Sequence, residues 1–199
     1  MTPVSRSDSV SAAEIAAALQ RRLFSAVNED NGLNVYAVLD GASIPELLDQ
    51  LYADEQPQFE CLYRGEIEPD IAEVAPYLVL LEPGSRFTDW LLSECMGQHW
   101  GIFATSAADL DDTRRHFRRL LVVKDPEGAQ VYFRFYDPRV LRIFLPTCGA
   151  AGLYAFFDGA TDYFFEGEKK ASLHHCSFSG KLVTEDIDLS ADEGAAAPR

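Results

Sequence analysis

Apolar residues follow two spacings along the chain, one typical of helices and one typical of strands. In Ser11–Val27 they recur every three or four residues, and Ser11 with Glu14 forms a capping box that marks the start of a helix. The next segment, Leu33–Leu39, is apolar almost throughout, a pattern typical of a strand that is buried on both faces. The first part of the chain therefore predicts a helix followed by a strand in the centre of a sheet.

Turn residues and helix caps divide the rest of the chain into further short elements. Strands are predicted at Phe59–Tyr63, Tyr77–Leu81, His99–Ala104, Val122–Lys124, Gln130–Tyr136, Leu153–Phe157, Tyr163–Gly167 and Ala171–Phe178. Helices are predicted from Ser43 to Asp54, from Ser85 onward, and from Ser106 or Asp109 to Leu120, with a loop at Gly65–Glu73. This alternation favours an α/β fold with a mixed β-sheet flanked by helices, largely parallel with some antiparallel pairing. The strands after Pro146 are expected to form a C-terminal β-rich extension of the same domain.

The stretch Val131–Pro146 shows the sharpest change of pattern. Its first half alternates between two kinds of side chain, as a strand with two unlike faces does. Asp137 then offers a helix N-cap, and Pro138 takes the first helical position, where its missing N–H costs nothing. The prediction is a strand that leads directly into a short capped helix. Three arginines surround this junction: Arg134, Arg139 and Arg142.

A second group of arginines lies on the predicted helix that ends near residue 120. Arg114, Arg115, Arg118 and Arg119 share one side of this helix, opposite its apolar side. Aspartates at the start of the helix and arginines near its end suit the helix dipole. Two interpretations are open at this point. The arginines form either a solvated charged face or a docking surface for an acidic or polar partner.

The chain as a whole is strongly acidic, with 17 basic and 32 acidic residues and a formal net charge of −15. Phosphate backbones and anionic lipid surfaces repel such a charge, so neither nucleic acid nor a membrane is expected as a partner. No apolar run reaches the roughly 18 residues that cross a bilayer, and no signal peptide is evident, so a cytoplasmic protein is expected. We divide the chain into a flexible N-terminus (1–10), a single α/β domain (11–183) and an acidic disordered tail (184–199).

Motifs for catalysis and metal binding are sparse. The sequence contains no P-loop, GxSxG or HExxH pattern, and its four cysteines are widely spaced without a CxxC pair. The densest polar cluster is His174-His175-Cys176, in which His174 and Cys176 share one face of a strand. A small cytosolic enzyme that uses this Cys/His pair is therefore the alternative to a binding protein. Apart from that alternative, no catalytic residue, cofactor or metal site is predicted.

Five segments, in this order along the chain, together resemble one bacterial family. They are YAVLDGA (Tyr36–Ala42), APYLVLL (Ala75–Leu81), HWGIFATS (His99–Ser106), HFRRLLVV (His116–Val123) and RFYDPRVLRIFLP (Arg134–Pro146). The set, within a core of about residues 33–146, resembles the cytoplasmic effector chaperones, or adaptors, of type VI secretion. The family usually has Leu where Phe117 stands, a small departure.

The resemblance implies partner binding rather than catalysis. It implies that the chain binds a toxin effector, stabilises it, and promotes its loading onto the spike protein VgrG. Aromatic and arginine anchors carry much of the affinity of protein interfaces. The candidate partner-binding residues are therefore Arg115, Arg118, Arg119, Arg134, Arg139 and Arg142. Asp137 and Pro138 are assigned a structural role at the start of their helix.

Overall fold

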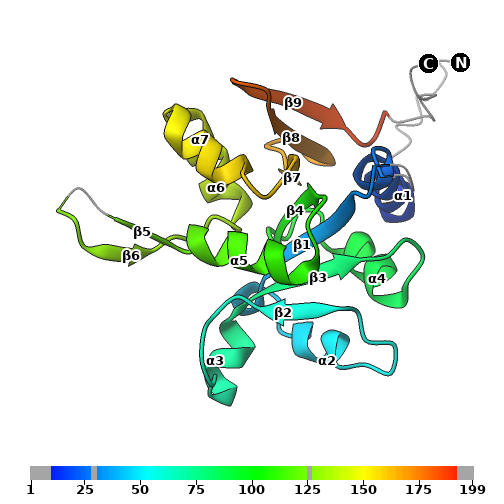
Figure 1. The fold of residues 1–199 in the computed structure, drawn as a ribbon. Coiled ribbons are helices and arrows are strands. Elements are labelled where there is room, and N and C mark those ends of the chain that lie inside the picture. Colours follow the sequence, from blue (N-terminus) through cyan, green and yellow to red (C-terminus); the bar gives the residue numbers. More distant parts are fainter. Residues whose placement is uncertain (1–9, 28–30, 125–126, 192–199) are drawn as a thin grey trace, which may run out of the picture.

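The computed structural model describes residues 10–27, 31–124 and 127–191 (Figure 1). A seven-stranded sheet forms its centre, in the order β2-β3-β1-β4-β7-β8-β9, and β5 and β6 form a separate two-stranded sheet. The strands are β1 (Asn34–Asp40), β2 (Phe59–Cys61), β3 (Pro76–Leu81), β4 (Gly101–Ser106), β5 (Val122–Lys124), β6 (Gln130–Tyr132), β7 (Asp162–Glu166), β8 (Ser172–Phe178) and β9 (Leu182–Asp188). The predicted mixed α/β fold is confirmed. Within the described ranges every pair of neighbouring strands is antiparallel, so the prediction of a largely parallel sheet is wrong.

Burial of the central strands on both faces explains this error. Alternate side chains of β1 enter two hydrophobic clusters, Val35, Ala37 and Leu39 on one face and Tyr36 and Val38 on the other. A continuous apolar run is typical of parallel strands, which are covered on both faces. Here helices cover both faces of an antiparallel sheet, so the same run reports burial without fixing the strand direction.

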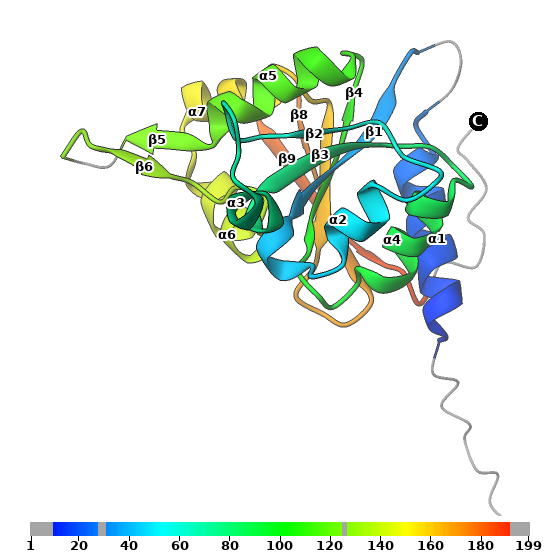
Figure 2. The same ribbon diagram turned by 90° about the horizontal axis from the view of Figure 1, so that it is seen from below.

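Helices form a layer on each side of the sheet (Figure 2). The helices are α1 (Ala12–Phe24), α2 (Leu47–Leu51), α3 (Pro69–Val74), α4 (Arg86–Glu94), α5 (Leu110–Leu120), α6 (Pro138–Phe144) and α7 (Ala150–Phe157), with 3₁₀ turns η1 (Gly41–Ser43) and η2 (Leu145–Thr147). Residues of α1, α2 and α4 belong to the first cluster, and residues of α5, α6 and α7 belong to the second. None of these helices combines the length and the apolar composition that a bilayer crossing requires.

Three helix starts follow the predicted capping chemistry. The Ser11 hydroxyl accepts a hydrogen bond from the Glu14 backbone, and the Glu14 side chain accepts one from the Ser11 backbone, which completes the capping box. Of the two predicted caps for α5, Asp109 is the one used, and its carboxylate accepts from the Asp112 N–H at 2.8 Å. Asp137 caps α6 and Pro138 is its first residue, as predicted.

Other predicted elements are wrong in type or extent. Leu153–Phe157 lies in helix α7 rather than in a strand, because its apolar residues turn one helical face toward the second cluster. Gly65–Glu73 contains the start of α3, whose first position is a proline. Ser43 ends η1 and does not cap a helix to Asp54, since α2 covers only Leu47–Leu51.

The hairpin of β5 and β6 projects from the body of the molecule (Figure 1). Its second strand ends at Tyr132, so the prediction that the strand continues to Tyr136 is wrong. After Phe133 the chain turns, with the Asp137 N–H donating to the Arg134 carbonyl at 3.0 Å. This turn brings Phe135 into the core, where its ring stacks on Phe117 with a centroid distance of 5.6 Å.

The C-terminal strands extend the main sheet instead of forming a second domain. β7 pairs with β4, and β8 and β9 follow in order. The prediction of a disordered tail from residue 184 is wrong for residues 184–188, because they belong to β9 and pair with β8. The prediction relied on the acidic composition of this segment. One face of β9 nevertheless places Ile187 in the core, which holds the strand in the sheet. Residues 192–199, and residues 1–9 of the predicted flexible N-terminus, lie outside the described residues.

Candidate partner-binding surface

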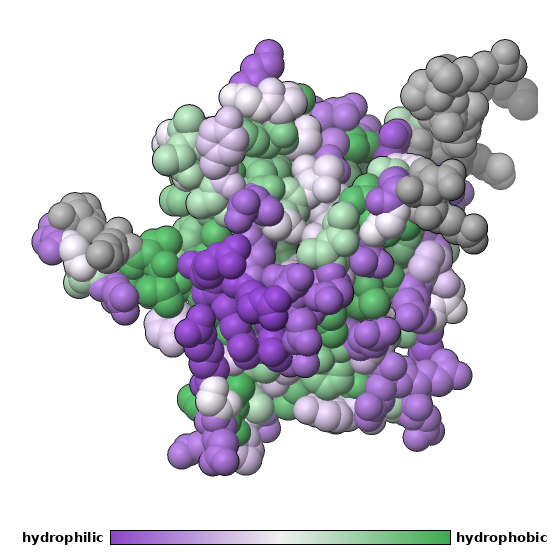
Figure 3. Space-filling view, viewed as in Figure 1, coloured by the Kyte–Doolittle hydropathy of each residue, from purple (hydrophilic) through white to green (hydrophobic). Residues whose placement is uncertain are grey.

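The projecting hairpin carries exposed apolar side chains on both of its faces. Tyr132 is 74% exposed, and Val122 and Val131 are each 40% exposed. Val122 stands opposite Tyr132 in the ladder, while Val131 stands opposite Val123 and points to the other face. Figure 3 shows this apolar surface at the base of the hairpin, beside the polar surface of α5. A strand pair that is partly exposed on both faces differs from the strands in the centre of the main sheet.

Helix α3 adds to this apolar surface. Ile71 is 46% exposed and Val74 is 44% exposed. Of the nine large hydrophobic side chains that are exposed among the described residues, five belong to the hairpin or to α3. Exposed apolar residues are ordinary when scattered, but a cluster of them marks an interaction site.

A groove of about 600 Å³ lies between the hairpin and the segment that leads from β2 into α3. We call it the hairpin groove. Its apolar lining consists of Leu62, Tyr63, Ile67, Ile71, Leu121, Val122 and Tyr132, and its charged lining of Arg64, Glu66, Glu68 and Arg118. The Tyr63 and Tyr132 rings meet edge to face across it, with centroids 5.9 Å apart. The groove thus combines apolar walls with four charged groups, and such a mixture of apolar and polar lining is usual in binding sites.

Arg118 holds the segment that forms one wall of the hairpin groove. Its guanidinium donates to the backbone carbonyls of Cys61, Leu62 and Tyr63 at 2.8, 3.1 and 2.6 Å. Burial lowers the pKa of Arg118, and the neighbouring Arg114 lowers it further. Carbonyl oxygens satisfy hydrogen-bond donors but do not neutralise the charge, so Arg118 brings a positive charge into the groove.

A second polar cluster joins the end of β1 to the start of α6. The buried Asp40 carboxylate accepts from the Ser43 hydroxyl at 2.8 Å and also from Arg134. Asp137 accepts two hydrogen bonds from the Arg139 side chain, at 2.9 and 2.8 Å, besides one from the Arg139 backbone. Burial by itself would raise the pKa of Asp137, but these hydrogen bonds outweigh it and leave the pKa below its usual value.

Tyr63 lies between this polar cluster and the hairpin groove. Burial raises the pKa of Tyr63, and the nearby Tyr132, which lines the groove, and Asp40, which belongs to the cluster, raise it further. Arg134 interacts with the same tyrosine and lies over the Tyr136 ring, 6.0 Å from its centroid. Two of the six predicted arginines, Arg118 and Arg134, are therefore brought together around one aromatic residue.

The other four predicted arginines lie apart from this site. Arg115 pairs with Asp112 on the solvent side of α5, and Arg119 approaches Asp158 at 3.6 Å. Arg139 forms an ion pair with Asp137, and Arg142 donates a hydrogen bond to the Glu166 carbonyl. Their assignment to partner binding stays a prediction. Sequence reasoning did not single out Tyr63, Ile71 or Tyr132, although Tyr132 lies on the polar side of the alternating stretch and could have been noticed there.

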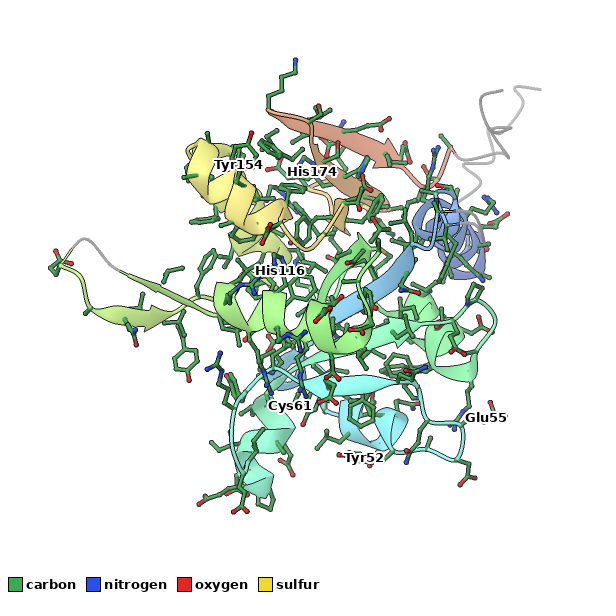
Figure 4. All side chains as sticks on the ribbon, viewed as in Figure 1. Tyr52, Glu55, Cys61, His116, Tyr154 and His174 are labelled. Carbon is green, nitrogen blue, oxygen red and sulfur yellow. The ribbon has the colours of Figure 1, made fainter. Side chains whose placement is uncertain are left out.

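The Cys/His alternative loses support from the environment of its thiol. Cys176 is 1% exposed, and burial raises its pKa to about 12, so the thiolate is scarce near neutral pH. His174 contacts Asp186 instead, with 2.6 Å between ring nitrogen and carboxylate. Figure 4 shows His174 and Cys61 on strands toward opposite edges of the sheet. In the part of the chain that the structure describes, no three His, Cys, Asp or Glu side chains gather in a way that would hold a metal ion.

Comparison with known proteins gives one finding on the family. The sequence profile of a family described as "Domain of unknown function (DUF4123)" matches residues 35–162, more than half of the chain. That span runs from β1 to the start of β7 and includes both the hairpin groove and the Asp40–Arg134 cluster. No curated protein and no solved structure matches the chain. The chain belongs to the DUF4123 family, which is associated with the effector adaptors of type VI secretion.

Proposed function

We propose that this protein is a cytoplasmic chaperone and adaptor of type VI secretion. It binds a toxin effector, stabilises it, and promotes its loading onto the VgrG spike. The observation that carries the proposal is the hairpin groove, an exposed apolar site inside the part of the chain that matches the family. A folded chain that keeps Tyr132, Ile71 and Val122 exposed has apolar surface available for a partner.

The composition of the groove suits protein binding. Tyrosine and arginine are the residue types that most often dominate interface energy, when they lie in a pocket that a partner can seal from water. Tyr63, Tyr132 and Arg118 provide these types within one groove. The partner gains by the same contact, because its own apolar surface is withdrawn from water and from aggregation.

Co-expression tests the proposal. This chain is produced with a tagged toxin effector and a tagged VgrG from the same genome. The complexes are purified, and their molecular masses are measured. We expect a stable complex with the effector, and an effector that aggregates or is degraded when this chain is absent. An effector that is equally soluble and equally well loaded without this chain would overturn the proposal.

Two matched tyrosines locate the binding site. Tyr132 is 74% exposed in the groove, and Tyr154 is 62% exposed on α7, and each makes one edge-to-face contact, with Tyr63 and Phe178. Tyr132→Ser is expected to weaken effector binding by about tenfold or more, since hot-spot residues exceed that effect when truncated. Tyr154→Ser should bind like the wild type. Equal effects of the two substitutions would exclude the groove as the effector site.

A thiol titration separates this proposal from the enzyme alternative. Because burial raises the pKa of both Cys95 and Cys176, we expect these two thiols to react slowly with a thiol reagent at pH 7 in the folded protein. The same titration in denaturant should show all four cysteines. A fast-reacting Cys176 in the folded state would restore the enzyme hypothesis.

A further inference from the structure

The hairpin is a sheet with two strands of three residues each. All three residues of β6 are exposed. Isolated two-stranded hairpins are marginally stable in water, and a third strand or a packed face stabilises them. In the described structure neither outer edge of the hairpin pairs with another strand, so each offers main-chain groups to a partner.

The register shows which groups these are. The Phe133 N–H donates to the Leu121 carbonyl at 2.8 Å, and the ladder continues with Val122 opposite Tyr132 and Val123 opposite Val131. Hydrogen-bonded and non-hydrogen-bonded pairs alternate in an antiparallel ladder. The main-chain N–H and C=O of Val131 therefore form hydrogen bonds to β5. The main-chain groups of Gln130 and Tyr132 point the other way, to the free edge of β6. Since Tyr132 also lines the hairpin groove, this free edge of β6 runs beside it.

Arg118, one of the charged residues of the groove, has no acidic partner among the residues that the structure describes. The described hydrogen bonds of the Arg118 side chain all go to carbonyl oxygens, and the nearby acid Glu60 pairs with Arg114. No carboxylate of the described residues lies within ion-pair distance of Arg118. The two groove glutamates, Glu66 and Glu68, are exposed to water instead. A carboxylate brought in by a partner would meet a partly desolvated guanidinium, where the pair is stronger than at the surface.

We propose that the partner enters the hairpin groove as an extended acidic-apolar segment that adds a third strand to β6 and places a carboxylate on Arg118. This inference rests on the proposed function and specifies how the partner is recognised. Main-chain hydrogen bonds to Gln130 and Tyr132 supply affinity, and the groove selects alternate side chains, as in other cases of strand addition. Apolar side chains of the segment lie against Ile71 and Tyr132, which the free protein leaves exposed.

A second copy of this chain fits the groove less well. Two copies with a formal net charge of −15 each repel each other across their whole surfaces, whereas a short segment brings only a carboxylate that Arg118 can pair. A helical segment would fill the groove but would leave the edge of β6 unpaired, because its own main-chain groups are already bonded. Only an extended segment uses both the free edge and the groove.

Gln130 allows the strand addition to be tested without loss of the fold. Gln130→Pro removes an outward N–H at an edge position, where proline is tolerated. Gln130→Ala is the matched control, because it removes the same side chain and keeps the N–H. We expect Gln130→Pro to weaken binding of the co-purified effector by about tenfold or more, with Gln130→Ala unchanged and both variants melting like the wild type. Equal binding by both variants would overturn the added strand.

Peptides that tile the co-purified effector test the chemistry of the segment. One peptide is expected to bind and to shift the amide NMR signals of Gln130 and Tyr132. Replacing a single acidic residue of that peptide by its amide should weaken binding several-fold, and raising the salt concentration should reduce this difference. Binding that is insensitive to every such replacement would remove the carboxylate from the inference.

The outcomes distinguish this inference from the proposed function. If no effector co-purifies with the wild-type chain, the proposed function is wrong, and the inference that rests on it is wrong as well. If the effector co-purifies, and Gln130→Pro also retains it with wild-type affinity, the adaptor function stands and the added strand is wrong. A partner that binds as a helix would appear as amide shifts confined to Ile71 and Tyr63, and that pattern would also overturn the inference.

Discussion

Strand β1 and strand β6 are built from similar residues and end in opposite environments. Tyr36 of β1 is 0% exposed, and its hydroxyl donates to the Ala108 carbonyl at 2.8 Å. Tyr132 of β6 is 74% exposed, with one ring contact to Tyr63. Both tyrosines directly follow a valine in the sequence. Local pattern therefore predicts that each segment is a strand, and only the position of the strand in the fold decides whether its side chains are buried.

The difference has an energetic meaning. Complete burial of a large apolar side chain is worth on the order of 2 kcal/mol. In β1 that free energy stabilises the fold, whereas in β6 most of it remains available to a partner. The body of the molecule and the hairpin should therefore respond in opposite ways to substitution, the body through stability and the hairpin through binding.

The largest expected effect comes from a pair of aromatic residues three positions apart. Phe135 is 0% exposed and stacks on Phe117, so Phe135→Ala should lower the free energy of unfolding by about 3 to 5 kcal/mol. Tyr132→Ala should change it by no more than about 0.5 kcal/mol, because exposed side chains contribute little to the fold. Urea denaturation of both variants measures the contrast. Similar losses in the two would mean that the hairpin is part of the cooperative core.

This pair also shows what the sequence could and could not predict. The strand into Val131–Tyr132, the Asp137 cap and the Pro138 position all follow from local rules, and all are present. The turn after Phe133 does not follow from them, because it accompanies the burial of Phe135 against Phe117, a contact between residues on either side of the hairpin. Tertiary packing overrode an alternating pattern that was locally consistent with a longer strand.

The candidate site has the same limitation. Arg118 was predicted because it belongs to a charged helix face, but its contacts with the carbonyls at 61–63 depend on how α5 crosses β2. The hairpin groove joins residues that are about 60 positions apart in sequence, such as Ile71 and Tyr132. The direction of the strands was predicted wrongly for a related reason. The apolar content of β1 and β3 indicates that they are buried, but not whether they run parallel or antiparallel.

A second prediction concerns the pH dependence of the body. Burial, and next the nearby Arg119, lower the pKa of His116 to about 4. The unfolded chain has the ordinary histidine pKa of about 6.5, so it binds a proton more readily than the folded chain, and stability falls as the pH drops from about 6.5 to about 4. The expected loss from this residue is about 3 kcal/mol, because one pKa unit corresponds to about 1.4 kcal/mol.

Comparison with His116→Gln isolates that loss, because the carboxylates titrate in both proteins. Unfolding curves in urea at pH 7 and at pH 4 give the change for each. We expect the wild type to lose about 3 kcal/mol more than the variant between the two pH values. Parallel losses would show that His116 is accessible to protons in the folded state.

A third prediction concerns the cluster that links the body to the hairpin. The Asp40 side chain is 3% exposed, and Arg134→Ala leaves it with the Ser43 hydroxyl alone, at an expected cost of about 2 kcal/mol. Arg139→Ala should cost less, about 1 kcal/mol, because the Arg139 side chain is 59% exposed and Asp137 keeps its backbone hydrogen bond. Thermal unfolding at pH 7 measures both. The reverse order of stability would mean that Asp40 is reached by water.

The smallest expected effect concerns the arginines of α5 that lie outside the groove. Arg115→Glu with Arg119→Glu breaks only surface ion pairs, with Asp112 and Asp158, and should change stability by about 1 kcal/mol or less. Lys169→Glu with Lys170→Glu is the matched control, because it changes the net charge equally on exposed residues elsewhere. If Arg115 and Arg119 border the partner, the first pair of changes should slow association several-fold more than the control, and high salt should remove the difference. Equal rates for the two double variants would mean that Arg115 and Arg119 form a solvated surface, and that the partner meets the chain through the hairpin and the groove, Arg118 included.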